Sequence, residues 1–344
     1  MIAALDASYS IGSALSGVGV YSREILNGIA ALRPDETFLH CYRPHRLWRG
    51  LRATRPANAR VRPLVDSWAP FQCDIFHALN QRLPRKRFRH TVCTFHDLFV
   101  MSGEYSTAEF RARFTQQARE AAQRAELIIC VSRFTAAQVE SLLGVHASRL
   151  RVIHHGTRFI DPPLPAQREP WILHVGAVQA RKNLILLIEA FEQAAPAPWR
   201  LVLAGADGYG AQQVRARAEA SRARERIEFT GWIDDARLAE LYRRSSLFAF
   251  PSLDEGFGIP VLEAMAWGLP VVASNGSSLP EVCGEAALLV NPRDADAFAA
   301  ALSAVIGNAA LAAELASRGR ERARRRTWRA AAEETLRVYD ELVS

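Results

Sequence analysis

Two glutamates with a glycine loop between them form the stretch of this chain that is best suited to chemistry. Residues 255–270 read EGFGIPVLEAMAWGLP, so seven residues separate Glu255 from Glu263. The spacing predicts a strand, a loop and a short helix with Pro260 in its first turn and Gly268 just past its end. Free N–H groups at the start of such a helix bind anions or hydroxyl groups. We expect Glu255 at the mouth of a polyol site and Glu263 about one turn into the helix. The plainer alternative is a strand–turn–helix with two solvated glutamates.

A pair of adjacent cations marks a second candidate position. Arg181 and Lys182 follow a predicted strand over residues 171–177, and Asn183 has the residue type of an N-cap for the next helix. Two cations beside the positive end of a helix dipole are unfavourable unless an anion binds there or solvent screens them. Arginine can hold a diphosphate through paired hydrogen bonds, and lysine adds a compact charge. The pair therefore predicts an anion site. Such a site would suit a departing diphosphate, whose negative charge must be stabilised.

The first half of the chain offers two more candidates. Gly17 and Gly19 directly precede a helical pattern, where backbone N–H groups could approach a phosphate or a sugar. A dinucleotide fingerprint would need a third glycine where Ser22 stands, so an NAD site is disfavoured. His96 and Asp97 end the strand pattern HTVCTFHD. A lone histidine there would be interpreted as a satisfied core residue.

Strand and helix patterns alternate along the chain, which predicts an α/β protein with doubly wound parallel sheets. The proline-rich segment 161–170 is expected to link two Rossmann-like halves that face each other across a ligand cleft. We therefore expect an acceptor-side domain over residues 1–163, a donor domain over 164–325 and a final helix over 326–344. The strand patterns cover residues 2–7, 73–78, 90–97, 127–132, 150–155, 171–177, 200–206, 226–231, 247–252, 270–274 and 286–290.

Composition favours a two-domain enzyme in a reducing compartment. The chain has 344 residues, of which 49% are hydrophobic, and no run reaches the roughly 18 apolar residues of a membrane span. The opening residues MIAALDAS lack the charged segment of a signal peptide. Five scattered cysteines without a C-x-x-C pair predict free thiols. We therefore expect a cytoplasmic location.

The net charge of +7 comes almost entirely from arginine, because Lys86 and Lys182 are the only lysines. Residues 37–65 contain seven arginines and no acidic residue, and residues 82–89 form a second basic cluster. Such clusters are typical of a solvated face, of nucleic-acid binding or of contact with anionic lipids. Few aromatic residues are interleaved with the arginines, which disfavours nucleic acid. Of the functional interpretations we prefer a membrane surface.

No metal site is expected. Asp294 and Asp296 have a D-x-D spacing, but a helical run follows them, so we interpret them as N-terminal capping residues. The same interpretation applies to Asp234 and Asp235, which precede RLAELY.

The stretch at 255–270, together with GAVQARKNL at 176–184, resembles retaining glycosyltransferase family 4, also described as glycosyl transferases group 1, of the GT-B architecture. The resemblance covers nearly the whole chain. It implies a hexosyltransferase that retains the anomeric configuration, needs neither metal nor cofactor, and returns its final helix to the first domain. Front-face attack within an ion pair is implied, with the departing diphosphate taking the proton of the acceptor.

The resemblance also implies roles for individual residues. Gly176, Arg181 and Lys182 would hold the diphosphate, and Glu263 would accept from the ribose. His96 would contact the transferred sugar, with Asp97 orienting the site. The loop at Gly17 and Gly19 would cover the donor phosphates and the acceptor. The donor-sugar hydroxyls would be held by Glu255, Gly256, Phe257, Gly258 and Ile259.

The donor is expected to be GDP-mannose, because the residues SSLPE at 277–281 are similar to those of mannosyltransferase members that use it. The acceptor would be a glycan or lipid-linked saccharide in surface polysaccharide or lipopolysaccharide biosynthesis. A UDP-sugar is the next donor. A nucleotide-sugar epimerase, a sugar phosphorylase and, more remotely, a basic nucleic-acid-binding protein stay open as alternatives.

Overall fold

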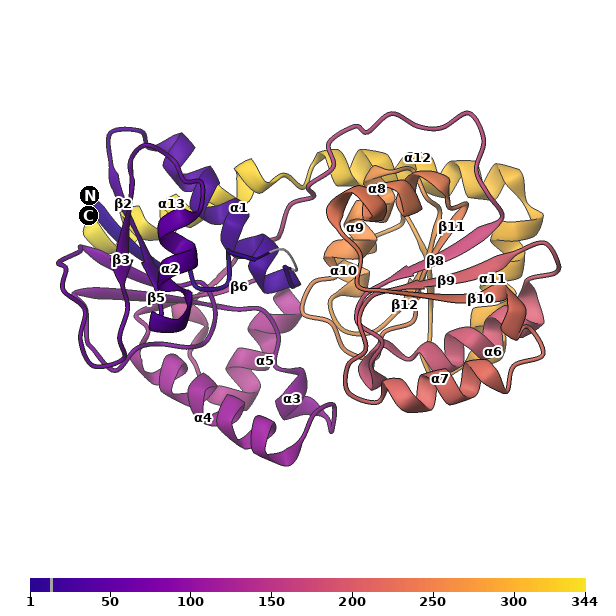
Figure 1. The fold of residues 1–344 in the computed structure, drawn as a ribbon, viewed down its shortest axis with the longest axis horizontal. Helices are drawn as coiled ribbons and strands as arrows, with labels where there is room; N and C mark the ends of the chain where they lie inside the picture. The colour runs from indigo at the N-terminus through magenta and orange to yellow at the C-terminus, as the bar shows by residue number, and fades with distance from the viewer. Residues whose placement is uncertain (13–14) are drawn as a thin grey trace. The chain divides into compact units, whose positions relative to one another are not determined.

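The computed structural model describes residues 1–12 and 15–344, which divide into two compact units. The first unit comprises Met1–Gly156 and Trp328–Ser344, and the second comprises Thr157–Thr327. Each unit is a parallel sheet with helices (Figure 1), which confirms the predicted pair of Rossmann-like α/β halves.

The first sheet has seven parallel strands in the order β3-β2-β1-β4-β5-β6-β7. The order reverses beside β1, as in doubly wound sheets, whose ligands bind beyond the carboxyl ends of the strands. The strands are β1 (Ile2–Asp6), β2 (Thr37–Tyr42), β3 (Ala59–Pro63), β4 (Ile75–Ala78), β5 (His90–Phe95), β6 (Leu127–Cys130) and β7 (Leu150–Val152). The helices of this part of the chain are α1 (Gly17–Leu32), α2 (Pro44–Arg52), α3 (Phe99–Ser102), α4 (Ala108–Arg124) and α5 (Arg133–Leu143).

The last helix, α13 (Trp328–Val343), belongs to the first unit. It packs on α1, where Gly28 permits the close approach, because a Cβ at this position would lie 2.8 Å from Cβ of Ala332. The buried His77 joins α13 to the sheet through bonds of 2.6 Å to Tyr339 and 2.9 Å to Thr94. His77 is therefore a satisfied core residue.

The second sheet has six parallel strands in the order β10-β9-β8-β11-β12-β13. Its core includes Ile172, Phe191, Leu203, Ala249 and Phe298, which are fully buried. The strands are β8 (Trp171–Val175), β9 (Arg200–Ala204), β10 (Ile227–Gly231), β11 (Leu247–Phe250), β12 (Val271–Ser274) and β13 (Leu288–Val290). The helices are α6 (Leu184–Ala194), α7 (Ala211–Glu219), α8 (Asp235–Arg244), α9 (Ile259–Ala266), α10 (Leu279–Cys283), α11 (Ala295–Gly307) and α12 (Ala309–Arg324).

No single helix in the described part of the chain is long and apolar enough to cross a membrane. Among residues 1–12 and 15–344, α11 and α12 taken together, across a bend of 99°, are the one pair that meets that criterion of length and composition.

Every predicted strand is present, but β2 and β3 were not predicted. Both lie in the arginine-rich segment, and β3 reads ARVRP, in which alternating arginines conceal the strand pattern. All five cysteines are free, as expected, and four of them are buried.

The domain division differs from the predicted one, because the chain passes between the units at Gly156–Thr157 and at Thr327–Trp328. The proline-rich segment 161–170 is not the linker. Its Arg168 donates to three carbonyls at the end of α8 and, over 2.6 Å, to that of Trp267. These bonds attach the segment to the second unit.

Candidate functional site

A buried cluster of opposite charges lies beyond the carboxyl ends of β8 and β11. Lys182 Nζ forms an ion pair with Glu255 Oε1, and Arg181 Nη1 lies 3.1 Å from Glu255 Oε2. Lys182 and Glu255 are each only 6% exposed. The structure thus brings together three of the predicted site residues. Two cations thus share the Glu255 carboxylate, and the buried Asp254 lies directly beside it in the chain.

Backbone contacts fix the two cations on a short 3-10 turn, Ala180–Lys182. The Leu253 N–H donates to the Arg181 carbonyl over 2.8 Å, and Arg181 Nη1 donates to the Asp254 carbonyl over 2.9 Å. Asn183 occupies the N-cap position of α6, but the expected side-chain cap is wrong. Its amide donates instead to the carbonyls of Pro251 and Pro292, so it joins three loops.

Gly176 and His174 pack against Lys182. Gly176 has a φ of +154°, and a Cβ there would lie 3.3 Å from Lys182 Cε. The ring of Phe250 lies 4.8 Å below Lys182 Nζ and stacks on His174. His174 is fully buried and donates from Nδ1 to the Ala249 carbonyl over 3.1 Å. Burial, and then the charge of Lys182, lower the pKa of His174 to about 3, so the imidazole is neutral. The sequence interpretation missed His174, although it ends the strand run WILH.

Glu255 is ionised throughout the physiological range. Burial alone would raise the pKa of its carboxyl group, but Lys182 and Arg181 outweigh burial and lower the pKa to about 2. A carboxyl whose pKa is lower in the folded state stabilises the fold above its unfolded value, near 4.5, and loses that contribution as the pH falls towards 2.

The loop after Glu255 has the predicted strand–loop–helix form. Gly258, with a φ of +98°, is the N-cap of α9, and Pro260 lies in the first turn. Gly256 and Phe257 are buried, and Ile259 begins the helix. Two serines hold this loop in place. The Glu255 N–H donates to Ser277 Oγ over 3.2 Å, and Ser278 Oγ donates to the carbonyls of Glu255 and Phe257.

Glu263 lies inside an ion-pair network that the sequence did not indicate. It is 1% exposed, and its Oε1 accepts from Arg158 Nε over 2.7 Å. Its Oε2 lies 3.2 Å from the Tyr242 hydroxyl, and Arg158 also pairs with Asp235 at 2.7 Å. Burial raises the pKa of Glu263 in spite of Arg158. Arg158 and Glu263 are 105 residues apart, and no local pattern links them.

The remaining predicted residues lie in the first unit. Gly17 and Gly19 form the first turn of α1, capped by Ser16, and a Cβ at Gly19 would lie 2.8 Å from the Tyr9 carbonyl. Packing therefore requires glycine at position 19. Asp97 is half-buried directly after β5.

His96 is 8% exposed and lies 2.9 Å from the Leu79 carbonyl through Nε2. A carbonyl can only accept, so Nε2 carries the proton and Nδ1 has a lone pair. Burial lowers the pKa of His96 to about 4, so the ring is neutral at physiological pH. The Tyr21 ring packs edge-on at 4.7 Å, and His155 lies at 5.6 Å between ring centres. The sequence did not indicate this contact with His155.

Of the four aspartates interpreted as capping residues, Asp294 and Asp234 are N-caps, whereas Asp296 and Asp235 lie in the first turns of their helices and Asp235 pairs with Arg158. Asp294 accepts from the Ala297 N–H over 2.8 Å at the start of α11, and Asp234 accepts from the Arg237 N–H at the start of α8. Within residues 1–12 and 15–344, no three His, Cys, Asp or Glu side chains group as metal ligands.

Comparison with known proteins gives the family and the fold. The family model described as "Glycosyl transferases group 1" matches residues 157–325, and that of "Glycosyltransferase Family 4" matches residues 16–158. The chain is 30% identical to O-antigen chain mannosyltransferase B of Escherichia coli, over 81% of this chain and 78% of that protein.

Two solved structures share the fold across the whole chain. Sucrose-phosphate synthase from Thermosynechococcus elongatus has a TM-score of 0.81 and 22% identity, with 99% of this chain and 98% of that one covered. Anabaena HepE in complex with UDP-glucose has a TM-score of 0.75 and 19% identity, with 99% of each chain covered. The two doubly wound units are those of the GT-B architecture, and the chain belongs to glycosyltransferase family 4.

Proposed function

We propose that this chain is a retaining hexosyltransferase that moves mannose from GDP-mannose to a glycan or glycolipid acceptor during surface polysaccharide biosynthesis, such as that of lipopolysaccharide. The observation that carries the proposal is the buried cluster of Lys182, Arg181 and Glu255, in which two cations share one carboxylate. The name of the O-antigen mannosyltransferase relative supports both the sugar and the kind of product.

The cluster suits a nucleoside diphosphate leaving group. When the bond to the sugar breaks, negative charge develops on the diphosphate, and preorganised cations in a buried site stabilise that charge strongly. Arg181 offers paired N–H donors and Lys182 a point charge. The diphosphate can itself accept the proton of the acceptor hydroxyl. In this scheme Gly176 lets a phosphate approach Lys182, and neither a metal nor a cofactor is needed.

The sugar would be held by acceptors and by backbone donors. Ionised Glu255 accepts from sugar hydroxyls, and the N–H groups around Gly258 at the start of α9 donate to the ligand. Neutral His96 offers its Nδ1 lone pair to a hydroxyl of the transferred sugar, with Asp97 beside it. Gly17 and Gly19 lie in the first turn of α1. Because they have no side chains, the donor and the acceptor could approach the backbone N–H groups of this turn.

Glu263 would receive the ribose hydroxyls of the nucleotide. Arg158 and Tyr242 already contact its two oxygens, but each carboxylate oxygen has a second lone pair. Arg158 opposes the rise in the pKa of Glu263 that burial causes and fixes the carboxylate in place, so we assign Arg158 as the positioning residue of the ribose contact.

A second donor is favoured by one comparison. The complex of HepE with UDP-glucose makes a UDP-sugar the next candidate. GDP-mannose stays first because the relative with the higher sequence identity, 30% against 19%, is named as a mannosyltransferase.

Helix α2 supports contact of this enzyme with an anionic membrane surface, on its cytoplasmic face. Its only buried residue is Gly50, which packs on the ring of Tyr42. Trp48 is 75% exposed and Leu51 47% exposed, and Arg49 and Arg52 beside them are exposed too. Arginines around exposed aromatic and aliphatic side chains are typical of interfacial helices. Arg43, by contrast, is buried between Asp6 and Asp66 and is structural.

The donor can be tested by thermal unfolding with GDP, UDP, ADP or NAD, in the presence of EDTA. A nucleotide at 100 times its dissociation constant adds about 2.7 kcal/mol to the free energy of unfolding. We expect stabilisation by GDP. Stabilisation by UDP instead would show that the donor is a UDP-sugar. Stabilisation by NAD alone would contradict the proposed site. If EDTA abolished transfer with the selected donor, the metal-free mechanism would be wrong.

Replacing Lys182 by alanine should lower kcat for sugar transfer by roughly 100-fold, because one of two cations that stabilise the diphosphate is lost. Steady-state transfer from the selected donor measures this. The matched control is Lys86→Ala, which removes the other lysine, held by the Ala69 carbonyl in the first unit. Near-normal turnover of the Lys182 variant would refute its role.

Replacing Arg158 by glutamine should lower the melting temperature more at pH 8 than at pH 5. The pKa of Glu263 is raised in the folded state, so the folded protein binds this proton more tightly than the unfolded chain does. Protonated Glu263 therefore contributes fully to the free energy of unfolding below about pH 4.5. This contribution is lost as the pH rises through the pKa of Glu263 in the folded state. Leaving the buried carboxylate unpaired costs about 3–5 kcal/mol at high pH.

Calorimetry at the two pH values measures the difference. Arg329→Gln is the control, since it removes an exposed pair with Glu333 and should have little effect at either pH. An equal loss for Arg158→Gln at both pH values would show that Glu263 is not the group responsible.

Replacing Trp48 by alanine should reduce sedimentation with phosphatidylglycerol vesicles several-fold, because burial of the indole ring is lost. Trp232→Ala, which removes an exposed tryptophan of the second unit, should sediment like the unaltered chain. Equal binding to phosphatidylcholine vesicles, or no effect of Trp48→Ala, would exclude α2 as the anionic-membrane contact.

A further inference from the structure

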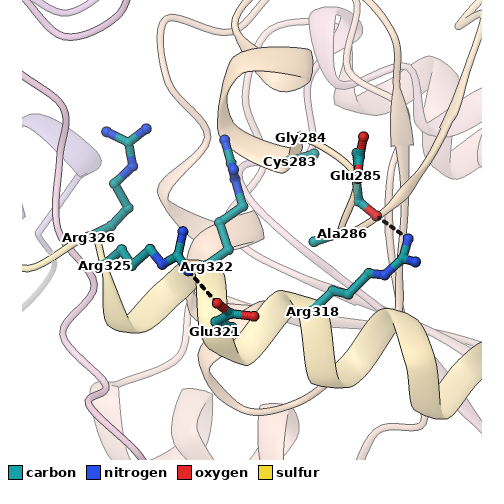
Figure 2. Close-up of a pocket in the computed structure, with 9 residues that line it drawn as sticks. All are labelled: Cys283, Gly284, Glu285, Ala286, Arg318, Glu321, Arg322, Arg325 and Arg326. Atoms are coloured by element: carbon teal, nitrogen blue, oxygen red, sulfur yellow. Dashed lines mark hydrogen bonds and ion pairs between the residues drawn. The ribbon is translucent and has the colours of Figure 1, made fainter.

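A second basic cavity lies in the second unit and shares no residue with the Lys182 cluster. It is lined by the end of α12 and the loop between α10 and β13, is open to solvent, and has a volume of about 650 Å³. Figure 2 shows Arg318 and Arg322 extending from α12 towards the loop of Gly284 and Glu285. The charged residues that line the cavity are Arg318, Arg322, Arg325, Arg326, Glu285 and Glu321.

Arg322 is the centre of this cavity, and its charge is not balanced. Its Nε and Nη2 donate to the carbonyls of Val282 and Glu281, which close the last turn of α10. Gly284, with a φ of +54°, permits the approach, because a Cβ there would lie 2.7 Å from Nη1. The Nη1 group has no hydrogen-bond partner, and no carboxylate of the described residues lies within ion-pair distance of the half-buried guanidinium.

Other arginines of the lining lie close to Arg322 along the chain. Arg318, Arg322 and Arg326 follow each other at intervals of four residues, a spacing at which like charges repel. Glu321 pairs with Arg325, and Arg318 pairs with Glu314 outside the cavity at 2.6 Å. Arg318 and Arg325 thus have carboxylate partners, and Arg318 also donates to the Glu285 carbonyl, whereas Arg322 contacts carbonyl oxygens alone.

Structural causes account for only part of this pattern. A helix C-terminus favours cations, and Arg322 caps α10. Neither cause explains why a guanidinium keeps donors directed at an open cavity, nor why three further arginines gather there. Burial also raises the pKa of the neighbouring Cys283 to about 12, so its thiol is neutral and supplies no counter-charge. An anion from outside the chain would provide the missing charge.

We propose that this cavity is a second anion site that binds a phosphate or diphosphate group through Arg322, with Arg318 and Arg325 at its rim. Arginine binds phosphate oxygens through paired hydrogen bonds, and the volume is that of a small-molecule site. The phosphate could belong to a free phosphate ester or to a lipid headgroup. The site is independent of the proposed transferase chemistry, because it shares no residue with the Lys182 cluster.

Calorimetric titration of the full chain with inorganic pyrophosphate tests the site. Lys182→Ala weakens binding at the donor site, so pyrophosphate binding in this variant that also depends on Arg322 reports the cavity. Within the Lys182→Ala background, Arg322→Gln should weaken pyrophosphate binding at least about tenfold. Arg243→Gln is the matched control, since it removes an exposed arginine from the last turn of α8, and it should bind normally.

The double variant Arg318→Gln, Arg325→Gln keeps the cap of α10 and should also weaken binding, which separates ligand contact from misfolding. Vesicles that contain phosphatidic acid identify the source of the phosphate. If Arg322→Gln weakens the binding of pyrophosphate, the ligand is a free phosphate. If Arg322→Gln weakens the binding of vesicles but not that of pyrophosphate, the ligand is a lipid headgroup. The proposal is overturned if no probe binds the Lys182→Ala variant, or if Arg322→Gln binds both probes normally.

Discussion

The ion pair between Lys182 and Glu255 is the constraint on which the second unit's candidate site depends. Both groups are almost fully buried, and withdrawing such ions from water costs several kcal/mol each. Only close geometry and further hydrogen bonds offset that cost. The pair joins loops that are 73 residues apart in sequence, and each loop is held in turn by its own contacts. Arg181 is fixed by Leu253 and Asp254, and Glu255 by Ser277 and Ser278. Stability alone does not explain why these charges are buried at such a cost in free energy, which favours ligand binding as the explanation.

The balance of charge separates structural ion pairs from candidate ligand sites in this chain. Arg43 lies between two carboxylates, Asp6 and Asp66, and needs no further partner. Arg158 likewise contacts both Glu263 and Asp235. At Glu255 the ratio is reversed, since two cations share one carboxylate. Arg322 has only carbonyl oxygens as partners. A half-buried cation whose partners are carbonyl oxygens is a feature that a phosphate can satisfy, and it distinguishes Arg322 from Arg43 and Arg158.

What could be predicted from the sequence was local. The loop and helix around Gly258 follow from glycine and proline positions, and the caps at Asp234 and Asp294 follow from residue type. Contacts between distant segments could not be predicted. Asn183 has a capping residue type, but the carbonyls of Pro251 and Pro292 take its amide. The partner of Glu263 is an arginine 105 residues earlier. Strand β3 is an edge strand with half-exposed arginines, so hydrophobic periodicity was too weak to indicate it.

Burial, more than solution pH, sets the charge of the residues discussed here. His96 and His174 are neutral because burial lowers the pKa of each to about 4 and about 3, while Glu255 stays ionised because its cations lower its pKa to about 2. These three groups therefore keep one charge state between pH 5 and 8. Glu263 is the exception, since burial raises its pKa and Arg158 opposes that shift. A neutral His96 can accept from a hydroxyl through Nδ1, whereas a charged one could only donate. The buried setting of these residues thus fixes which atoms are donors and which are acceptors before any ligand binds.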